Sequence, residues 1–361
     1  MVPLIYALKN GELGRIEQMA LAALDGLRDE FVPCVFAREG AVLTEAEKLD
    51  FSVHSFSNTS NFAMKLRFLL ASNHELSFIS TDSKFSYSII LLNLFYRKKI
   101  NHLHLISEET NENYDFSKIN NLNKYGVTFI TPSKFIKEKL IAHGTRQERI
   151  RVIENFLPEK VIDAIPRRMR FNTDGIKKVL IISKIEPNKK INFLFKALDL
   201  RPELNSLEFT ISGTGSKLEE LKNRAAKKYP NVKFSGIGEN ISNRVEDFDL
   251  YLQLCSNEST DLTILEALAA DVPVLVPENA GGTIFTHKIN GFIFEGNAAS
   301  LASRLHELSI TSSELLNAVA KGGRYLLNIK FSSESSIERY RRVLNEQKVP
   351  KVDLTRGKLI L

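Results

Sequence analysis

Short apolar runs alternate with longer segments of helical periodicity along almost the whole chain. The first half contains six runs of strand character. Helical patterns separate them, such as the one over 15–27, where apolar residues recur three and four positions apart. Nearly continuous apolar strands joined by helices are typical of an α/β fold with a parallel sheet covered on both faces. The strands predicted in this half are 3–8, 31–37, 50–56, 75–81, 100–106 and 126–132.

The pattern starts again after a polar, basic stretch at 165–178. The restart predicts a second parallel-sheet domain, and a length of 361 residues fits two domains. Its predicted strands are 178–184, 207–213, 232–236, 250–255 and 273–278, with helices at 190–199, 216–229 and 263–270.

The domains are predicted at 1–170 and 177–330, with the boundary at 165–177. An amphipathic helix over 330–347 begins the segment 331–361, which is predicted to pack back toward the first domain. The tail after this helix is either disordered or in contact with a membrane.

Composition narrows the class of ligand. Apolar residues make up 43% of the chain and charged residues 25%, an ordinary balance for a soluble globular protein with two cores. A net charge of +6 and a pI of about 9.1 suit an anionic ligand or a membrane surface. Both values fall far short of a basic stripe that binds nucleic acid, so no nucleic-acid partner is predicted.

The cysteines and the apolar runs indicate the compartment. Cys34 and Cys255 stand too far apart for a disulfide framework or a metal cluster, which predicts two buried thiols in a reducing cytosol. The longest apolar run, 88–96, is shorter than the roughly 18–20 residues that span a bilayer. The N-terminus has no secretory signal pattern. We therefore expect a cytoplasmic protein, either free or peripheral on the inner face of the membrane.

The segment 258–282 carries the clearest candidate chemistry. Ligands of open parallel sheets bind beyond the carboxyl ends of the strands, so two such domains face to face place a ligand in the cleft between them. Cap residues at 259–261 predict a helix that begins near Leu262, and its free N–H groups suit a phosphate. Glu258 precedes this helix, and Glu266, about one turn into it, can accept hydrogen bonds from a ribose diol. The alternative is a solvated surface helix.

A second candidate follows the first strand of the second domain. Lys184 stands after that strand, and Lys189 with Lys190 opens the next helix, so these cations can neutralise a diphosphate leaving group. A solvated turn has the same composition. The Gly-x-Gly at Gly213 and Gly215 lacks the rest of a dinucleotide fingerprint and is interpreted as a tight turn.

The first domain offers a glycine and two histidines. Gly14 stands before a helix and allows close approach of a phosphate. His102 and His104 lie on one face of a predicted strand, an arrangement more typical of a core than of a catalytic site. No neighbouring Cys or Asp completes a metal site. A histidine at the carboxyl end of a strand, facing the cleft, is nevertheless the natural general acid or base there.

These segments, in this order, resemble the retaining family 4 glycosyltransferases of the GT-B fold, over 177–345 and more loosely over 1–160. The glutamate, seven residues, glutamate motif corresponds to Glu258 and Glu266. The continuation "LEALAADVPVLVPENAGG", the segment "INGFIFEGN" and the block "SKIEPNKKINFLFKAL" follow the family pattern. Gly14 takes the glycine position of the first domain.

The resemblance implies two Rossmann-like domains facing a cleft and assigns roles. Glu266 holds the ribose of a nucleotide-sugar and Glu258 contacts the sugar. The departing diphosphate is stabilised by Lys184, Lys189 and the amides at Leu262 and Thr263. His104 matches the cleft histidine, with His102 as the alternative. The family needs no metal and no cofactor, because basic side chains and a helix dipole replace the cation.

The activity implied is transfer of a hexose from a UDP- or GDP-sugar to a hydroxyl acceptor. The acceptor is a glycan or a lipid-linked glycan of surface polysaccharide, lipopolysaccharide or glycolipid. Basic patches at Lys65/Arg67 and at 97–99 are candidates for docking on an anionic membrane, or else solvated helix faces.

Three departures from the family pattern keep other functions open. Lys184 replaces the usual arginine, Arg15 replaces the second glycine of the pair, and Ser-Thr-Asp follows Glu258. The alternatives are a catalytically silent GT-B protein that binds a glycan or serves as a partner subunit, and a nucleotide-sugar epimerase.

Overall fold

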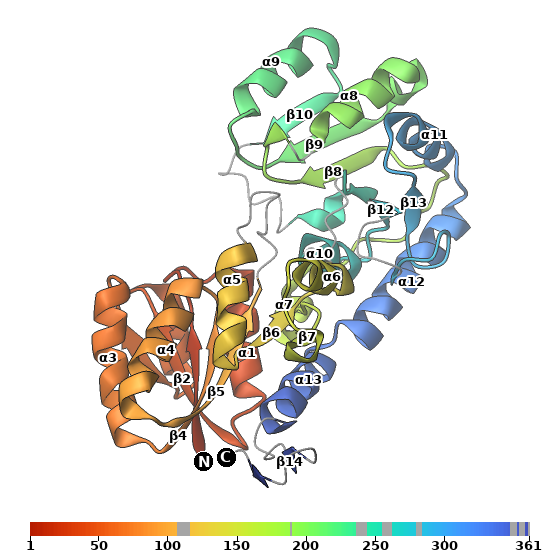
Figure 1. Ribbon diagram of the computed structural model, residues 1–361. Helices are drawn as coiled ribbons and strands as arrows, with labels where there is room; N and C mark the ends of the chain where they lie inside the picture. Colours follow the sequence, from red (N-terminus) through yellow and green to blue (C-terminus); the bar gives the residue numbers. More distant parts are fainter. Residues whose placement is uncertain are drawn as a thin grey trace. The chain divides into compact units, whose positions relative to one another are not determined.

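The computed structural model describes residues 1–106, 116–187, 190–235, 244–254, 262–278 and 284–346, together with short strands at 352–353 and 358–359. The chain forms two compact units (Figure 1). The first unit comprises Met1–Pro158 with Ser333–Leu361, and the second comprises Glu159–Ser332. The predicted first domain, 1–170, therefore extends too far along the chain.

The boundary between the units lies before residue 165 because hydrogen bonds and an ion pair attach residues 165–178 to the second unit. Arg168 donates its main-chain N–H to the carbonyl of Ala270 at 2.8 Å and pairs with Asp249 at 2.5 Å. Asp249 also accepts hydrogen bonds from the main-chain N–H groups of Lys177 and Lys178, at 2.7 and 2.9 Å. The side chain of Arg168 and the main chain of Lys177 and Lys178 are thus held within the second unit.

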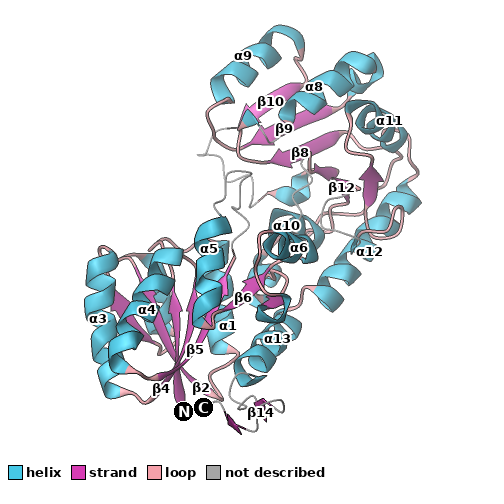
Figure 2. Ribbon diagram, viewed as in Figure 1, coloured by secondary structure: helices cyan, strands magenta, loops and turns pink. Residues whose placement is uncertain are grey.

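The first unit is built on a seven-stranded parallel sheet in the order β3-β2-β1-β4-β5-β6-β7. Figure 2 shows its strands in magenta among the cyan helices. The six predicted strands all form, and β7 is an additional strand that the apolar pattern does not predict. The strands are β1 (Val2–Ala7), β2 (Phe31–Ala37), β3 (Ser52–Ser55), β4 (Glu75–Ser80), β5 (Lys99–Leu105), β6 (Thr128–Thr131) and β7 (Ile150–Val152).

The two faces of this sheet are covered by different helices. Alternate residues of a strand point to opposite faces, so Leu4 and Tyr6 join one core cluster while Ile5 and Ala7 join another. The first cluster contains side chains of α1, α2 and α13, and the second contains side chains of α3 and α4. The helices are α1 (Arg15–Asp25), α2 (Ala41–Lys48), α3 (Thr59–Ser72), α4 (Ser83–Tyr96), α5 (Phe116–Leu122), α6 (Lys134–Ala142) and α13 (Ser333–Glu346).

The C-terminal helix α13 is held on the first unit by both apolar and polar contacts. Tyr340 and Leu344 are buried in the core cluster of α1. Asn101 of β5 donates to the main-chain carbonyl of Leu344 at 2.9 Å, and Arg341 pairs with Glu30 at 2.7 Å. Because these contacts link residues more than 200 positions apart, α13 belongs to the first unit although it follows the second in the chain.

The second unit has a six-stranded parallel sheet in the order β10-β9-β8-β11-β12-β13. The five predicted strands form, and β13 is additional. The strands are β8 (Lys178–Ile182), β9 (Glu208–Ser212), β10 (Val232–Ser235), β11 (Leu250–Leu252), β12 (Val274–Pro277) and β13 (Phe292–Phe294). The helices are α7 (Glu159–Ala164), α8 (Ile191–Leu200), α9 (Leu218–Lys228), α10 (Leu262–Ala269), α11 (Ala298–Leu308) and α12 (Ser313–Lys330).

The strand order of the second sheet marks its ligand-binding edge. The chain first builds β8, β9 and β10 outward in one direction and then returns to place β11 on the other side of β8. A reversal of this kind opens a crevice beyond the carboxyl ends of the two central strands, where parallel sheets bind ligands. The predicted α/β fold with two parallel-sheet domains is confirmed.

Candidate functional site

The loop after β8 carries Lys184, an exposed side chain, and is fastened to the neighbouring β9–α9 turn. Ser183 donates its main-chain N–H to the carbonyl of Ser212 at 3.0 Å, and Ile185 donates to that of Thr214 at 2.7 Å. In return, Lys217 donates its main-chain N–H to the carbonyl of Ile185 at 3.0 Å. Lys184 therefore stands on a loop whose main chain is held on both sides of it.

Gly213 and Gly215 make this fastening possible. A Cβ at Gly213 would lie less than 3.0 Å from the carbonyl oxygen of Ser183, and one at Gly215 would come as close to that of Ile185. Gly213 also has a φ of +149°, a conformation that L side chains rarely adopt. The two glycines are thus required because two loops approach each other closely. The interpretation as a tight turn did not include this reason.

A carboxylate that sequence reasoning missed lies on the same loop. Ser216 donates its main-chain N–H and its hydroxyl to the carboxylate of Glu186, at 2.9 and 2.5 Å. The hydroxyl bond, followed by the main-chain bond and by the charge of Lys184, lowers the pKa of Glu186. A charged Glu186 therefore balances part of the charge of Lys184.

The helix α10 begins at Leu262, as predicted. Seven of its eight residues are buried, among them Glu266, which is 5% exposed, so the alternative of a solvated surface helix is wrong. Leu262 is buried in the first turn and Thr263 is partly buried beside it. Glu266 is thus a buried carboxylate on a helix that begins at the carboxyl edge of the sheet, and this position keeps it a candidate for ligand binding.

The α10 helix and the Lys184 loop belong to adjacent strands. The helix follows β11, and the loop follows β8, which is the neighbour of β11 in the sheet. Both therefore stand at the carboxyl edge at the point where the strand order reverses. The other predicted residues of this site, Glu258 and Lys189, lie outside the described residues.

Gln253 is a polar residue at this edge that sequence reasoning overlooked. It directly follows β11, is 6% exposed, and donates its main-chain N–H to the carbonyl of Leu275 at 3.0 Å. Neither its amide nitrogen nor its amide oxygen has a hydrogen-bond partner in the described structure. A lone glutamine inside an otherwise apolar strand was the available signal.

The predicted phosphate approach at Gly14 is occupied by a side chain of the protein itself. Gly14 is the N-cap of α1, and a Cβ there would lie 2.8 Å from Oε2 of Glu17. The carboxylate of Glu17 accepts hydrogen bonds from the main chain of residues 14 and 17, although burial, the larger effect, raises its pKa. Glu17 thus caps the helix end, and a phosphate at Gly14 would have to displace it.

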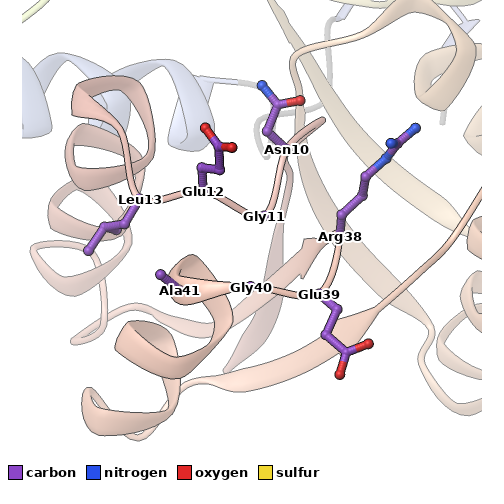
Figure 3. A pocket seen from close by; sticks show the side chains of 8 residues that line it. All are labelled: Asn10, Gly11, Glu12, Leu13, Arg38, Glu39, Gly40 and Ala41. Atoms are coloured by element: carbon purple, nitrogen blue, oxygen red, sulfur yellow. The ribbon is translucent and has the colours of Figure 1, made fainter. Parts of the chain in front are cut away.

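A cavity of about 530 Å³ lies beside this cap, at the carboxyl ends of β1 and β2. The side chains of Asn10 and Arg38 extend to the same side, and that of Glu39 points away (Figure 3). Gly11 and Gly40 let the two loops meet, since a Cβ at Gly11 would clash with the main-chain carbonyls of Arg38 and Glu39. The cavity therefore offers an amide and a guanidinium to a ligand of the first unit.

His102 and His104 share one buried cluster with two serines. Nε2 of His102 lies 3.0 Å from the hydroxyl of Ser80, and Nδ1 of His104 lies 2.9 Å from that of Ser86. The two hydroxyls are 2.7 Å apart. Burial lowers the pKa of His102 to about 3 and that of His104 to about 4, so both rings are neutral.

This burial bears on the predicted catalytic role. His104 is 1% exposed and His102 5% exposed, so neither ring is presented on the surface of the unit. The choice between them for a ligand contact stays a prediction. Elsewhere, Cys34 is buried as predicted, and Cys255 lies outside the described residues.

Neither a metal cluster nor a membrane-spanning helix occurs among the residues that the structure describes. No group of three or more His, Cys, Asp or Glu side chains there could hold a metal ion. No helix in the same ranges is long and apolar enough to cross a membrane.

Residues 165–325 match the family model for glycosyl transferases group 1. This segment is therefore similar to the group 1 glycosyl transferases. It contains Lys184, Gln253 and Glu266, and it falls within the second unit.

Two curated relatives share part of the chain. The UDP-N-acetylglucosamine–peptide N-acetylglucosaminyltransferase GtfA subunit of Streptococcus agalactiae is 23% identical over 184 residues, 50% of this chain and 35% of that protein. The uncharacterized glycosyltransferase MJ1607 of Methanocaldococcus jannaschii is 26% identical over 190 residues, 48% of each chain. The chain thus matches about a third to a half of the length of these relatives.

Solved structures share the fold over nearly the whole chain. Anabaena Alr3699/HepE in complex with UDP-glucose superposes with a TM-score of 0.75 at 17% identity, covering 96% of this chain and 100% of that one. The apo form of the lipopolysaccharide outer core galactosyltransferase WaaB gives a TM-score of 0.68 at 13% identity, with coverage of 96% and 100%. Together with the match to the group 1 model, these likenesses confirm the predicted GT-B architecture.

Proposed function

We propose that this chain is a retaining glycosyltransferase that moves a hexose from a nucleotide-diphosphate donor to a hydroxyl acceptor. The observation that carries the proposal is Glu266, a carboxylate buried on α10 of the segment that matches the group 1 model, at the sheet edge that also presents Lys184. The relatives lend support because each is named a glycosyltransferase or a subunit of one.

The second unit binds the donor in this proposal. Glu266 accepts hydrogen bonds from the ribose hydroxyls, and Glu258 contacts the sugar. The main-chain N–H groups of Leu262 and Thr263, at the start of α10, hold the phosphates with the positive end of the helix dipole. Lys184 and Lys189 add positive charge where the diphosphate departs.

The reaction needs no resident metal or other cofactor in this scheme. Breaking the sugar–phosphate bond leaves negative charge on the diphosphate, and the lysines and helix N–H groups stabilise that charge in place of a cation. The main-chain hydrogen bonds on both sides of Lys184 fix the point from which its side chain extends, which keeps the ammonium group within reach of the departing diphosphate.

A UDP-sugar is the first donor to test, with a GDP-sugar as the alternative. Solved neighbours with the same architecture were crystallised with UDP and with UDP-glucose. The acceptor that we propose is a glycan, free or lipid-linked, of surface polysaccharide, lipopolysaccharide or glycolipid. A cytoplasmic location, where nucleotide-sugars are made, completes this proposal.

The first unit binds the acceptor in the same scheme. Gly14 lets a phosphate approach the helix end once Glu17 has moved away, and the cavity beside it presents Arg38 to the acceptor. His104 acts as a neutral imidazole, because its low pKa leaves the ring uncharged near pH 7. Its burial implies that the surrounding side chains shift when a sugar binds.

One observation favours a second function, a silent GT-B protein that serves as a partner subunit. Glu17 already caps the helix end at Gly14, where the transferase scheme places an anion. One matching relative is itself named a subunit. A silent protein would bind no nucleotide, and this consequence separates the two functions.

Thermal unfolding with UDP, GDP, ADP and CMP, in the presence of EDTA, tests the proposal. A ligand at about a hundred times its Kd stabilises the folded protein by roughly 2.7 kcal/mol, which raises the melting temperature by several degrees. We expect one uridine or guanosine nucleotide to give this shift, Glu266→Ala to abolish it, and Glu314→Ala to retain it. Glu314 is a suitable control because it is an exposed glutamate on α12 of the same unit.

An unchanged melting temperature with all four nucleotides would reject donor binding and favour the silent protein. If a nucleotide binds, the anomeric configuration of the product of its sugar donor, followed by NMR, tests retention. Loss of binding in both glutamate variants would mean that Glu266 has no specific role.

A further inference from the structure

Five large apolar side chains gather on the outward faces of α3 and α4. They are Met64 and Phe68 on α3, and Leu91, Leu94 and Phe95 on α4, with exposed fractions between 51% and 85%. Fifteen large apolar side chains are exposed in the described part of the chain, and these five include both phenylalanines among them. We call the five residues the α3–α4 surface.

The two stripes form one surface because the helices pack side by side on the same face of the sheet (Figure 1). The inward stripe of α3, Phe62, Leu66 and Leu70, is fully buried. An α-helix turns 100° per residue, so Phe68, two residues beyond Leu66, points about 200° away from it.

The geometry of α4 repeats that of α3. Phe85 and Ile89 enter the core, and Leu91 lies two residues beyond Ile89. Leu91, Leu94 and Phe95 therefore face away from the sheet on the same side as the outward stripe of α3. Scattered apolar side chains on a surface are normal, but a contiguous group marks an interaction site.

Charge identifies the partner. Neither α3 nor α4 contains an Asp or a Glu, while Lys65, Arg67 and Lys84 lie on them and residues 97–99 add three cations after α4. Two carboxylates precede or follow these helices, and one of them neutralises Lys99, which leaves Arg97 and Lys98 as the cations after α4. Glu75 pairs with Lys99 at 3.1 Å, and Asp82 accepts the main-chain N–H of Lys84 at 2.8 Å as the cap of α4.

The end of α4 places basic residues directly beside the apolar stripe. Arg97 closes the helix in a left-handed conformation, with φ of 48°, two residues after Phe95. Asn93 then holds the next residue, since its side chain accepts the main-chain N–H of Lys98 at 2.8 Å. The turn therefore keeps the cations at the border of the apolar side chains.

We propose that the α3–α4 surface docks this protein on an anionic lipid bilayer. Phe68, Phe95 and their apolar neighbours enter the boundary between headgroups and acyl chains, and the surrounding cations contact lipid phosphates. The sequence predicts the basic patches, but only the fold shows that they border one apolar surface. Docking does not depend on the transfer reaction, so it stands or fails separately from the proposed function.

Co-sedimentation of the full chain with vesicles tests the proposal. One set of vesicles contains phosphatidylglycerol mixed with phosphatidylcholine, and the other contains phosphatidylcholine alone. We expect binding to the anionic set that weakens in high salt, and much weaker binding to the neutral set. Each cation near a membrane surface strengthens binding by about fivefold, so Arg67→Glu with Arg97→Glu should weaken it by well over tenfold.

The apolar part of the surface needs its own variant. Phe68→Ser with Phe95→Ser should weaken binding by at least about tenfold, because two exposed rings lose their insertion. Matched controls lie in the second unit, where Ile310→Ser with Tyr325→Ser removes apolar side chains of similar exposure. Lys196→Glu with Lys233→Glu is the control for charge, since both lysines are exposed there.

Wild-type protein that stays in solution with anionic vesicles would overturn the proposal and leave a protein partner as the occupant. Equal losses in the surface variants and their controls would overturn it as well. The melting temperature of every variant, with and without nucleotide, shows whether the protein is folded and whether donor binding survives. Retained nucleotide binding with lost vesicle binding is the result that we expect for both surface variants.

Discussion

Replacement of Gly213 by alanine is a sharp test of how the Lys184 loop is positioned. A Cβ at this residue would lie less than 3.0 Å from the carbonyl oxygen of Ser183, whereas ordinary van der Waals contact begins at 3.4 Å. The neighbouring atom belongs to the main chain and cannot rotate away as a flexible side chain would. The loop after β8 must therefore separate from the β9–α9 turn.

The cost has two parts. A non-glycine residue in a sparsely populated backbone conformation costs about 1–3 kcal/mol, and Gly213 has a φ of +149°. Separation of the loops also weakens the hydrogen bonds from Ser183 to Ser212 and from Ile185 to Thr214, each worth about 1 kcal/mol. We expect Gly213→Ala to lower the free energy of unfolding by about 3–5 kcal/mol.

The matched control is Gly296→Ala, in the same unit. Gly296 also has a positive φ, of 73°, but the nearest atom to an added Cβ is that of Pro277 at 3.9 Å. This variant carries the backbone strain without the clash, and its expected loss is about 1–2 kcal/mol. Urea unfolding of both variants measures the difference, and calorimetric titration with UDP measures whether the displaced loop weakens binding.

A Gly213→Ala variant that is no less stable than Gly296→Ala would contradict this prediction. In that case the close approach of the two loops does not constrain the main chain. If Gly213→Ala is destabilised but binds UDP as tightly as wild type, the contact between the two loops stabilises the fold. Ligand binding then does not depend on how this contact positions Lys184.

Two further predictions concern buried polar groups. Burial lowers the pKa of His104 from 6.5 to about 4, so between these values the unfolded chain binds a proton that the folded chain does not. Stability should therefore fall as pH drops through this range, with His104 contributing up to about 1.4 kcal/mol per pH unit in urea titrations and His102, whose pKa is lowered to about 3, adding its own share. His104→Gln should remove the His104 share and leave that of His102, and a profile like that of the exposed control His74→Gln would contradict this. Gln253→Leu should raise the free energy of unfolding by about 1–3 kcal/mol, because it removes two buried polar atoms that lack hydrogen bonds. Chemical unfolding measures this change, and a loss of stability would show that the amide stabilises the fold.

Strand position and helix position follow from local patterns in this chain. All eleven predicted strands form, because a run of apolar residues between helical patterns reports burial on both faces of a parallel sheet. The start of α10 at Leu262 is likewise local, since cap residues precede it. The missed strands β7 and β13 have only three residues each, too few to display a period; β11 is equally short, but the predicted run that contains it covers six positions, 250–255.

For the candidate site too, some features follow from the sequence and others only from the tertiary structure. The order of apolar runs shows that Lys184 and Glu266 each follow a strand, on the side where parallel sheets bind ligands. Only the strand order of the folded sheet makes those two strands, β8 and β11, neighbours. The state of the side chains cannot be inferred. Whether Glu266 is buried or solvated, and whether His104 is exposed or enclosed by serines, depends on which elements pack around it.

Local sequence therefore places the helices and strands and suggests the chemistry, because hydrophobic periodicity and cap residues act over a few positions. Only the tertiary structure brings Gly213 against Ser183, attaches α13 to the first unit, and joins Phe68 and Phe95 into one surface. These contacts connect residues that are distant in the chain. They depend on strand order and on which face of a sheet each helix covers, and a local sequence pattern encodes neither.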